Sequence, residues 1–215
     1  MKFLVALFFM GSVFSVLADS PLTSTHFAKA YENDKMVISA KVDGMNNKVL
    51  KFLGKEKKPA VTKLAIINQL GWGNKSYVTD FENYLLEKRI GLKPEVFEYL
   101  CAFSEEIPAE NKQTNLLTAE DLMCWAYFQA LGDYFNPSLA SKAAYLSFVR
   151  EPESMAHAAV FALIACQISF DTDWCGVYQI GKEFLVEKDY TKEKLSPEAV
   201  KIIMDYLNLY SADCK

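Results

Sequence analysis

The sequence predicts an all-α protein, built as an array of helical hairpins (an α–α superhelix) or, as the alternative, as a compact multi-helix bundle. Three observations predict this class. Apolar residues recur at helical spacing, no segment alternates apolar and polar residues for long enough to indicate a strand, and prolines and glycines divide the chain at short intervals. An apolar content of 51% excludes a disordered chain.

The chain begins with a segment typical of a secretory signal peptide, MKFLVALFFMGSVFSVLA. Lys2 supplies a positive charge, an almost wholly apolar run follows, and Val16 and Ala18 provide small or aliphatic side chains at a cleavage position before Asp19. As a retained anchor the segment would be short, because a membrane-spanning helix needs roughly 20 residues. We therefore expect residues 1–18 to be removed and the protein to be secreted or periplasmic.

The mature chain, residues 19–215, is expected to form a single all-helical domain, or two packed halves joined near residues 104–117. Proline suits the first turn of a helix and glycine the position after its end. Starts are marked by Pro59, Pro94, Asn136–Pro137, Glu151–Pro152 and Ser196–Pro197, by polar residues at 118–121 and 171–173, and ends by Gly44, Gly54, Gly71 and Gly91. The predicted helices cover about residues 24–42, 46–53, 60–70, 80–90, 94–104, 119–134, 137–149, 153–169, 174–187 and 197–210.

The stretch NQLGWGNKSYVTDFE, residues 68–82, contains part of a phosphate-loop pattern. It is incomplete, because Asn74 separates Gly73 from Lys75 and the segment follows a predicted helix rather than a strand. We predict a corner between two helices, with Gly71 ending the first. Thr79 and Glu82 are then expected to form a capping box at the start of the second.

Two predicted helices are apolar on every side, at Leu122–Phe128 and Ala158–Cys166, and should lie at the centre of the protein. The second run, at nine residues, is the longest uncharged apolar run after the signal, so no later segment is expected to span a membrane. By contrast, helix 80–90 carries its apolar residues on one side and should be peripheral.

The hairpin predicted for residues 119–149 has a spacing of aromatic and small residues that is found in a known repeat. The matching positions are Phe128, Leu131, Gly132, Phe135, Ala144 and Phe148. In these positions the hairpin resembles a tetratricopeptide repeat, although Ala156 stands in place of the closing proline and a second repeat does not follow. The resemblance implies a helical scaffold that binds peptide or protein segments on a concave face. The alternative is that small and aromatic residues simply allow two helices to pack closely.

The charge balance bears on possible partners. The formal net charge is −4, and −5 without Lys2. The one basic run, Lys55 to Lys58, lies between Gly54 and Pro59 and is expected to be a solvated turn. Such a chain lacks the clustered lysine and arginine that bind phosphate backbones, so nucleic acid is not an expected partner.

Few residues suit catalysis or metal binding. The mature chain has two histidines, His26 and His157. His157 would act as a general base only with a nucleophile and an orienting acid brought close by the fold, and no local motif nominates either. We expect His26 to stabilise a first turn and His157 to be partly buried, and we predict no catalytic residue, no metal site and no cofactor.

The five cysteines, Cys101, Cys124, Cys166, Cys175 and Cys214, include no Cys-x-x-Cys pair. In an exported protein, disulfides are permitted. Cys166 and Cys175 flank the predicted corner at residues 171–172, so two antiparallel helices would bring them together, and we predict this disulfide. The alternative is that they are free core thiols.

The sequence contains three candidate carboxylate pairs, at Glu105–Glu106, Glu120–Asp121 and Asp171–Asp173. The second falls in a first helical turn and the third at a cap, where negative charge is favoured without any catalytic role. The polar link at residues 104–115 is expected to be a binding loop or a spacer.

The leading prediction is an exported, non-enzymatic helical scaffold that binds a protein or peptide partner outside the cytoplasm. The alternatives are an extracytoplasmic hydrolase with a carboxylate pair and a carrier of an apolar small ligand. Tyr127, Tyr134 and Tyr178 on one exposed face would favour binding. Two carboxyls facing across a groove would favour hydrolysis, and an enclosed apolar void would favour carriage.

Overall fold

The computed structural model describes residues 19–102 and 110–215, and in these residues the protein is all-α, as predicted. The α-helices are α1 (Pro21–Ser24), α2 (Lys35–Asp43), α3 (Asn47–Leu53), α4 (Ala60–Leu70), α5 (Ser76–Lys88), α6 (Glu95–Cys101), α7 (Ala119–Gly132), α8 (Ser138–Arg150), α9 (Met155–Ser169), α10 (Trp174–Lys182) and α11 (Pro197–Leu207). Short 3₁₀ turns are η1 (Phe27–Tyr31), η2 (Thr114–Leu116) and η4 (Asn208–Asp213), and a π-helical turn, η3 (Glu183–Glu187), continues α10.

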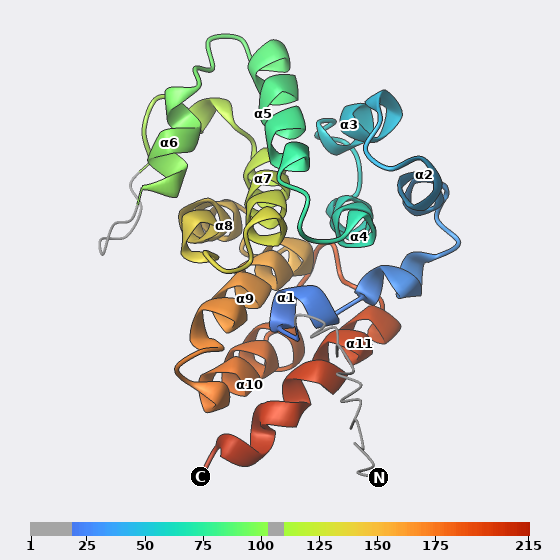
Figure 1. Cartoon of the computed structure of the whole chain (residues 1–215), viewed down its shortest axis with the longest axis vertical. Coiled ribbons are helices and arrows are strands. Elements are labelled where there is room, and N and C mark those ends of the chain that lie inside the picture. The colour runs from blue at the N-terminus through green and yellow to red at the C-terminus, as the bar shows by residue number, and fades with distance from the viewer. Residues whose placement is uncertain (1–18, 103–109) are drawn as a thin grey trace, which may run out of the picture.

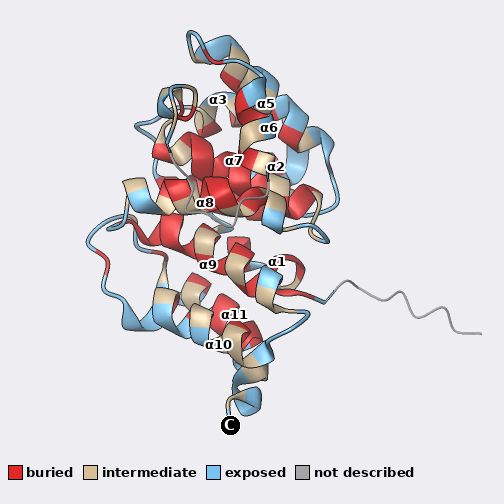
Figure 2. Cartoon of the chain, turned by 90° about the vertical axis from the view of Figure 1, so that its left-hand side faces the viewer, coloured by how far each residue is buried: buried red, intermediate tan, exposed pale blue. Residues whose placement is uncertain are grey.

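Helices α7, α8 and α9 form the centre of the molecule, with α5 and α6 above them and α10 and α11 below (Figure 1). α7 packs on α8, α8 on α9, and α9 on α10. α8 runs antiparallel to α7, and Ser147 Oγ near its end donates to the carbonyl oxygen of Ala119 at the start of α7 at 2.9 Å. Figure 2 shows most buried residues in this central band. The runs Leu122–Phe128 and Ala158–Cys166 lie within it, so the prediction of two central helices is confirmed.

The start of the described chain packs against its end. α1 lies on α9, and η1 lies between α4 and α11. The backbone N–H of Ser196 donates to the hydroxyl oxygen of Tyr31 at 2.9 Å. One cluster of buried side chains extends from Leu22 to Leu207. Segments from both ends of the sequence therefore contribute to the same core.

Several predicted helix boundaries are confirmed. α4 covers the predicted residues 60–70, and Ser196 caps α11, which has proline at its first position. Thr118 and Asp121 form a capping box at the start of α7. The turn at residues 54–59 is exposed at Lys55 to Lys58, as expected.

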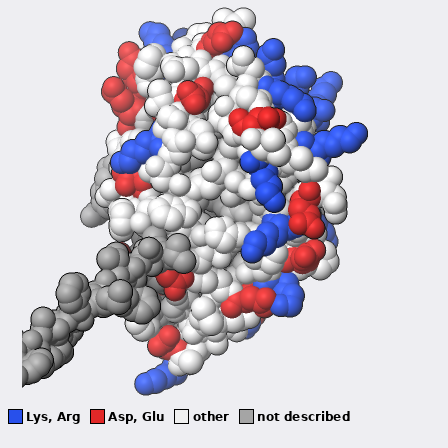
Figure 3. Space-filling view, turned by 45° about the vertical axis from the view of Figure 1, so that its right-hand side comes forward, with Lys and Arg blue, Asp and Glu red and all other residues white. Residues whose placement is uncertain are grey.

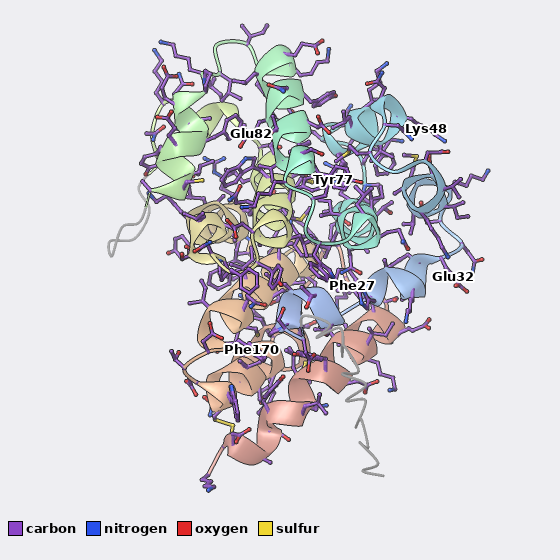
Figure 4. The ribbon with its side chains drawn as sticks, in the orientation of Figure 1. Phe27, Glu32, Lys48, Tyr77, Glu82 and Phe170 are labelled. Atoms are coloured by element: carbon purple, nitrogen blue, oxygen red, sulfur yellow. A yellow bond between two sulfur atoms is a disulfide. The ribbon has the colours of Figure 1, made fainter. Side chains whose placement is uncertain are left out.

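Three helix starts were predicted wrongly. α9 begins at Met155 with Ser154 as its N-cap, so Pro152 lies in the turn before the helix rather than in its first turn. The helix expected at 24–42 is divided into η1 and α2, because Asp34 accepts hydrogen bonds from the first backbone N–H groups of α2 and begins a new helix. α5 begins at Ser76 rather than near residue 80, so Thr79 lies inside it and forms no capping box with Glu82. Glu82 instead accepts a hydrogen bond from Trp125 Nε1 at 2.8 Å, between α5 and α7 (Figure 4), and burial raises the pKa of its carboxyl.

The segment predicted to be a signal peptide, residues 1–18, lies outside the described residues, as does the first part of the polar link, residues 103–109. The rest of that link is fixed by Arg150, which donates to Glu110 and to the carbonyl oxygens of Thr114 and Leu117. Within residues 19–102 and 110–215, no helix has both the length and the apolar character that crossing a membrane requires.

Candidate functional site

The corner between α4 and α5 is attached to the C-terminal end of α7. The backbone N–H of Gly73 donates to the carbonyl oxygen of Leu131 at 2.9 Å, and Lys75 Nζ lies 3.0 Å from Asp133 Oδ2. Gly71 and Gly73 have φ values of 80° and 84°, which residues with a Cβ rarely adopt. The predicted corner is therefore confirmed, and the lysine of the partial phosphate pattern is paired with a carboxylate.

These two glycines flank Trp72 and keep its side chain at the surface, where it is 41% exposed. Its ring packs edge-on against Tyr134, with 5.2 Å between centroids. The ring of Tyr134 lies 4.2 Å from that of Phe135, which is 79% exposed. We call Trp72, Tyr134 and Phe135 the aromatic ridge. Large apolar side chains that gather at a surface are typical of interaction sites.

A groove lies on one side of the ridge, next to η1, α2 and α4. It consists of two hollows of about 430 and 370 Å³ that share Lys29 and Lys41. The first hollow reaches Trp72, and the second opens beside the exposed side chain of Ile38. Lysines outnumber acids in the lining, which also holds Glu32, so we call it the basic groove.

His26 lines the first of these hollows, at the start of η1. Burial lowers the pKa of its imidazole, and the nearby charge of Lys29 lowers it further. His26 therefore belongs to the wall of the groove, and its side chain makes no capping hydrogen bond to the first turn of η1, contrary to the role that the sequence suggested.

A pocket of about 290 Å³ lies on the other side of the ridge. Tyr134 and Phe135 line it from the end of α7, and Phe170 lines it from the end of α9. Its charged lining residues are Asp19 and Asp171, with no lysine, arginine or histidine among the described ones. We call it the acidic pocket. Figure 3 shows the molecule after a 45° turn that brings the right-hand side of Figure 1 forward. The centre of this face is hollowed and mostly uncharged, and charged side chains lie along its right edge.

Asn68 fixes the floor of the basic groove by joining three segments. Its Oδ1 accepts a hydrogen bond from the backbone N–H of Ala28 at 2.8 Å, and its Nδ2 donates to the carbonyl oxygen of Thr25 at 3.0 Å and to the hydroxyl oxygen of Tyr127 at 2.9 Å. Phe27, which lies between these two backbone partners in the sequence, is fully buried. The base of the groove is therefore held together by hydrogen bonds between these segments.

The structure brings His157 next to a hydroxyl, but not into a site that a reactant can enter. His157 Nδ1 lies 2.7 Å from Ser154 Oγ, and both residues are buried. Among the described residues, its Nε2 has no hydrogen-bond partner. Burial, and then the charge of Lys63, lowers the pKa of the imidazole to about 4. This pair lies about one helical turn apart at the start of α9, where Ser154 is the N-cap residue but makes no side-chain capping hydrogen bond.

In each carboxylate pair that the structure describes, one member has a structural partner. Asp121, fully buried, accepts two hydrogen bonds from Arg89, at 2.8 and 2.9 Å. Asp173 accepts from the backbone N–H of Gly176 and caps α10. The pair at residues 105–106 lies outside the described residues. In the described part of the chain, no group of three or more histidine, cysteine or acidic residues is placed to hold a metal ion.

The predicted Cys166–Cys175 disulfide is wrong. Cys175 is bonded to Cys214, with 4.8 Å between their Cα atoms, and this bond joins α10 to the C-terminal end of the chain. Cys166 is buried and free, and its thiol donates to the carbonyl oxygen of Val177. The prediction used the equal spacing of the two cysteines about a corner, whereas the side chain of Cys166 is directed into the core. Burial raises the pKa of the Cys166 thiol to about 12.

The three tyrosines chosen to diagnose a binding face do not lie together on one. Tyr127 is fully buried and held by Asn68, and burial raises the pKa of its hydroxyl. Tyr178 packs against the core, partly buried. Of the three, Tyr134 alone belongs to the aromatic ridge.

Sequence reasoning missed Trp72 and Phe135 as surface residues. For Trp72 a signal was present, because a large aromatic residue between two glycines is easily turned away from both helices. For Phe135 the signal was Pro137 two residues later, since a helix usually ends before the residue that precedes a proline.

No family model matches the chain, and neither the curated proteins nor the solved structures gave a significant match.

Proposed function

We propose that this protein is exported and binds a segment of another protein along the aromatic ridge and the basic groove. The observation that carries the proposal is the ridge itself. Trp72 and Phe135 expose ring surface at a place where two positive-φ glycines and the end of α7 hold the backbone. Aromatic side chains of this kind supply much of the binding energy of protein interfaces. The extracytoplasmic location rests on the sequence of residues 1–18.

The lining of the groove favours a particular kind of partner. Lys29 and Lys41 lie beside exposed apolar side chains on a protein whose formal net charge is −4. A segment that carries carboxylates next to apolar side chains would complement this surface in charge and in polarity. In this proposal, α7 to α10 act as successive helical hairpins of a tetratricopeptide-like array, because each packs on the next.

The two alternative functions have less support. For a hydrolase, Asp121 would need a free carboxylate, but Arg89 binds both of its oxygens. For a carrier of an apolar ligand, the void should be enclosed, whereas the groove and the pocket open beside exposed side chains such as Ile38 and Phe135.

The proposal is tested by photo-crosslinking in the compartment to which the chain is exported. We place p-benzoylphenylalanine at position 135 and, as a matched control, at position 90, because Ile90 is 97% exposed and lies outside the groove and pocket linings. We expect a discrete crosslinked protein from position 135 that is absent from position 90.

Adding Trp72→Ala should remove this crosslink, and with the isolated partner it should weaken binding about tenfold or more, as expected for an aromatic anchor. The same crosslinked species from both positions, or binding unaffected by Trp72→Ala, would show that the ridge is not the binding surface.

A further inference from the structure

The ammonium group of Lys188 lies among three aromatic rings. Its Nζ is 4.5 Å from the ring centroid of Phe148, 5.5 Å from that of Tyr190 and 5.9 Å from that of Phe184. Energetically significant contacts between a cation and a ring occur roughly once in 70–80 residues of protein. Three such contacts at one nitrogen atom therefore describe a site bounded by rings, rather than a lysine that rests on one. We call Phe148, Phe184 and Tyr190 the aromatic cage.

The aromatic cage is held together by contacts that do not involve Lys188. Phe148 and Phe184 meet edge-on with 5.6 Å between centroids, and they pack on Phe161 at 5.5 and 5.4 Å. The hydroxyl of Tyr190, which is buried, donates to the carbonyl oxygen of Phe184 at 2.8 Å. The rings of Phe148 and Phe161 come from α8 and α9, which lie next to each other (Figure 1). We therefore expect the rings to keep their places when the lysine side chain moves away.

Lys188 is placed so that it can leave the cage. It is exposed, and it directly follows η3, a single π-helical turn of a kind that is frequent at functional sites. Nearby lysines are paired with carboxylates, Lys182 with Glu187 at 2.7 Å and Lys194 with Asp189 at 3.1 Å. Lys188 has no carboxylate partner of this kind within the described residues. Because a lysine ammonium is strongly hydrated, water compensates for the ring contacts that it loses on leaving.

We propose that the aromatic cage binds a quaternary ammonium group, and that Lys188 occupies the cage in the free protein and leaves it when this ligand binds. Aromatic cages recognise quaternary ammonium groups because ring faces attract cations, and methyl groups on the nitrogen bury apolar surface against the rings. The group has two candidate sources, a free small molecule or a trimethylated lysine of another protein. This inference does not depend on the proposed partner of the aromatic ridge, because the cage shares no residue with the ridge or the basic groove.

The test compares the natural chain with Lys188→Gln, which removes the internal cation. Titration calorimetry and NMR measure the binding of choline and of 3,3-dimethyl-1-butanol, a neutral molecule of the same shape. If Lys188 fills the cage for about four fifths of the time or more, its removal should tighten choline binding at least about fivefold. Binding of the neutral molecule should be weaker than that of choline in the variant, since it lacks the attraction between cation and ring.

Further variants locate the binding at the cage. In the Lys188→Gln background, Phe148→Leu and Phe184→Leu each replace a ring by an aliphatic side chain and should weaken choline binding about threefold or more. The matched control is Lys192→Gln, because Lys192 is an exposed lysine of the same region that pairs with Glu153 at 3.2 Å. This control should leave choline binding as it is in the natural chain. Circular dichroism verifies that each variant is folded, and the two leucine variants provide independent tests should one of them unfold.

A blocked trimethyllysine peptide, compared with choline, distinguishes the two sources. Tighter binding of the peptide assigns the cage to a protein side chain, and tighter binding of choline assigns it to a small molecule. The proposal is overturned if Lys188→Gln binds choline no more tightly than the natural chain does, or if choline binds that variant no more tightly than the neutral molecule does. Neither outcome would alter the crosslinking test of the ridge, so the two proposals fail separately.

Discussion

At the scale of single residues, the buried polar side chains of this protein join segments that are far apart in the sequence. Asn68 links the N-terminal segment to Tyr127 on α7, and Asp121 links α7 to Arg89 at the end of α5. A buried polar group costs free energy unless it is hydrogen-bonded, so each of these side chains specifies one arrangement of its helices. Asp121, one of the carboxylates that the sequence offered for catalysis, is therefore held in a structural ion pair.

His157 differs from these residues, because its Nε2 has no partner in the described structure. Its pKa is lowered to about 4, against 6.5 for an exposed histidine, so the folded state resists protonation while the unfolded state accepts a proton below pH 6.5. The unfolded state then binds more protons, and stability must fall as the pH drops from 6.5 towards 4. The shift corresponds to a loss of about 3 kcal/mol over this window.

This prediction is measured by urea unfolding between pH 7 and pH 4 for the natural chain and for His157→Gln. Glutamine does not titrate and can still accept a hydrogen bond from Ser154, so the variant removes the titration and keeps the local contact. The free energy of unfolding of the natural chain should fall by about 3 kcal/mol more than that of the variant. Parallel curves for the two proteins would mean that His157 is not the group responsible.

At the scale of elements, the sequence predicted helices well where capping chemistry is local. Residues 60–70 were predicted from Pro59 and Gly71, and both boundaries of α4 agree. The prediction of a helix start was wrong where two starting signals lie close together in the sequence. Thr79 and Glu82 have the spacing of a capping box, yet Asn74 accepts from the backbone N–H of Ser76 and the helix begins earlier. Spacing alone does not show which of two signals the tertiary structure uses.

The packing of α10 on α11 depends on the absence of a side chain at Gly181. A Cβ built there would lie 2.3 Å from Leu207 Cδ1 and 3.5 Å from Met204 Sδ, so it overlaps a buried residue. We expect Gly181→Ala to lower the free energy of unfolding by about 1–3 kcal/mol through overpacking.

A double-mutant cycle provides the control for this prediction. Leu207→Ala alone should cost about 2–5 kcal/mol, because it leaves a cavity, but it also removes the overlapping atom. The double variant should therefore be more stable than the sum of the two single effects predicts. Additive effects, measured by chemical unfolding, would show that Gly181 and Leu207 are not in contact.

At the scale of the whole molecule, the candidate site is assembled from segments that only the complete fold brings together. The aromatic ridge combines the corner after α4 with the end of α7, and the acidic pocket adds the start of the described chain and the end of α9. No sequence window contains more than part of it. The fold class was accessible because helical periodicity is local, whereas the site depends on contacts between residues more than sixty positions apart in the sequence.

The disulfide acts at this scale as well, because Cys175 and Cys214 are separated by 39 residues and their bond fixes the C-terminal end of the chain to α10. A crosslink of this length restricts the unfolded chain, and the chain-entropy model predicts a stabilisation of about 4 kcal/mol. Reduction should therefore lower the free energy of unfolding by about that amount, measured by urea unfolding with and without dithiothreitol. Cys214→Ser should abolish this sensitivity to reductant, and Cys166→Ala should retain it. If the sensitivity is instead lost in Cys166→Ala and kept in Cys214→Ser, Cys175 pairs across the α9–α10 corner and the C-terminal segment is free.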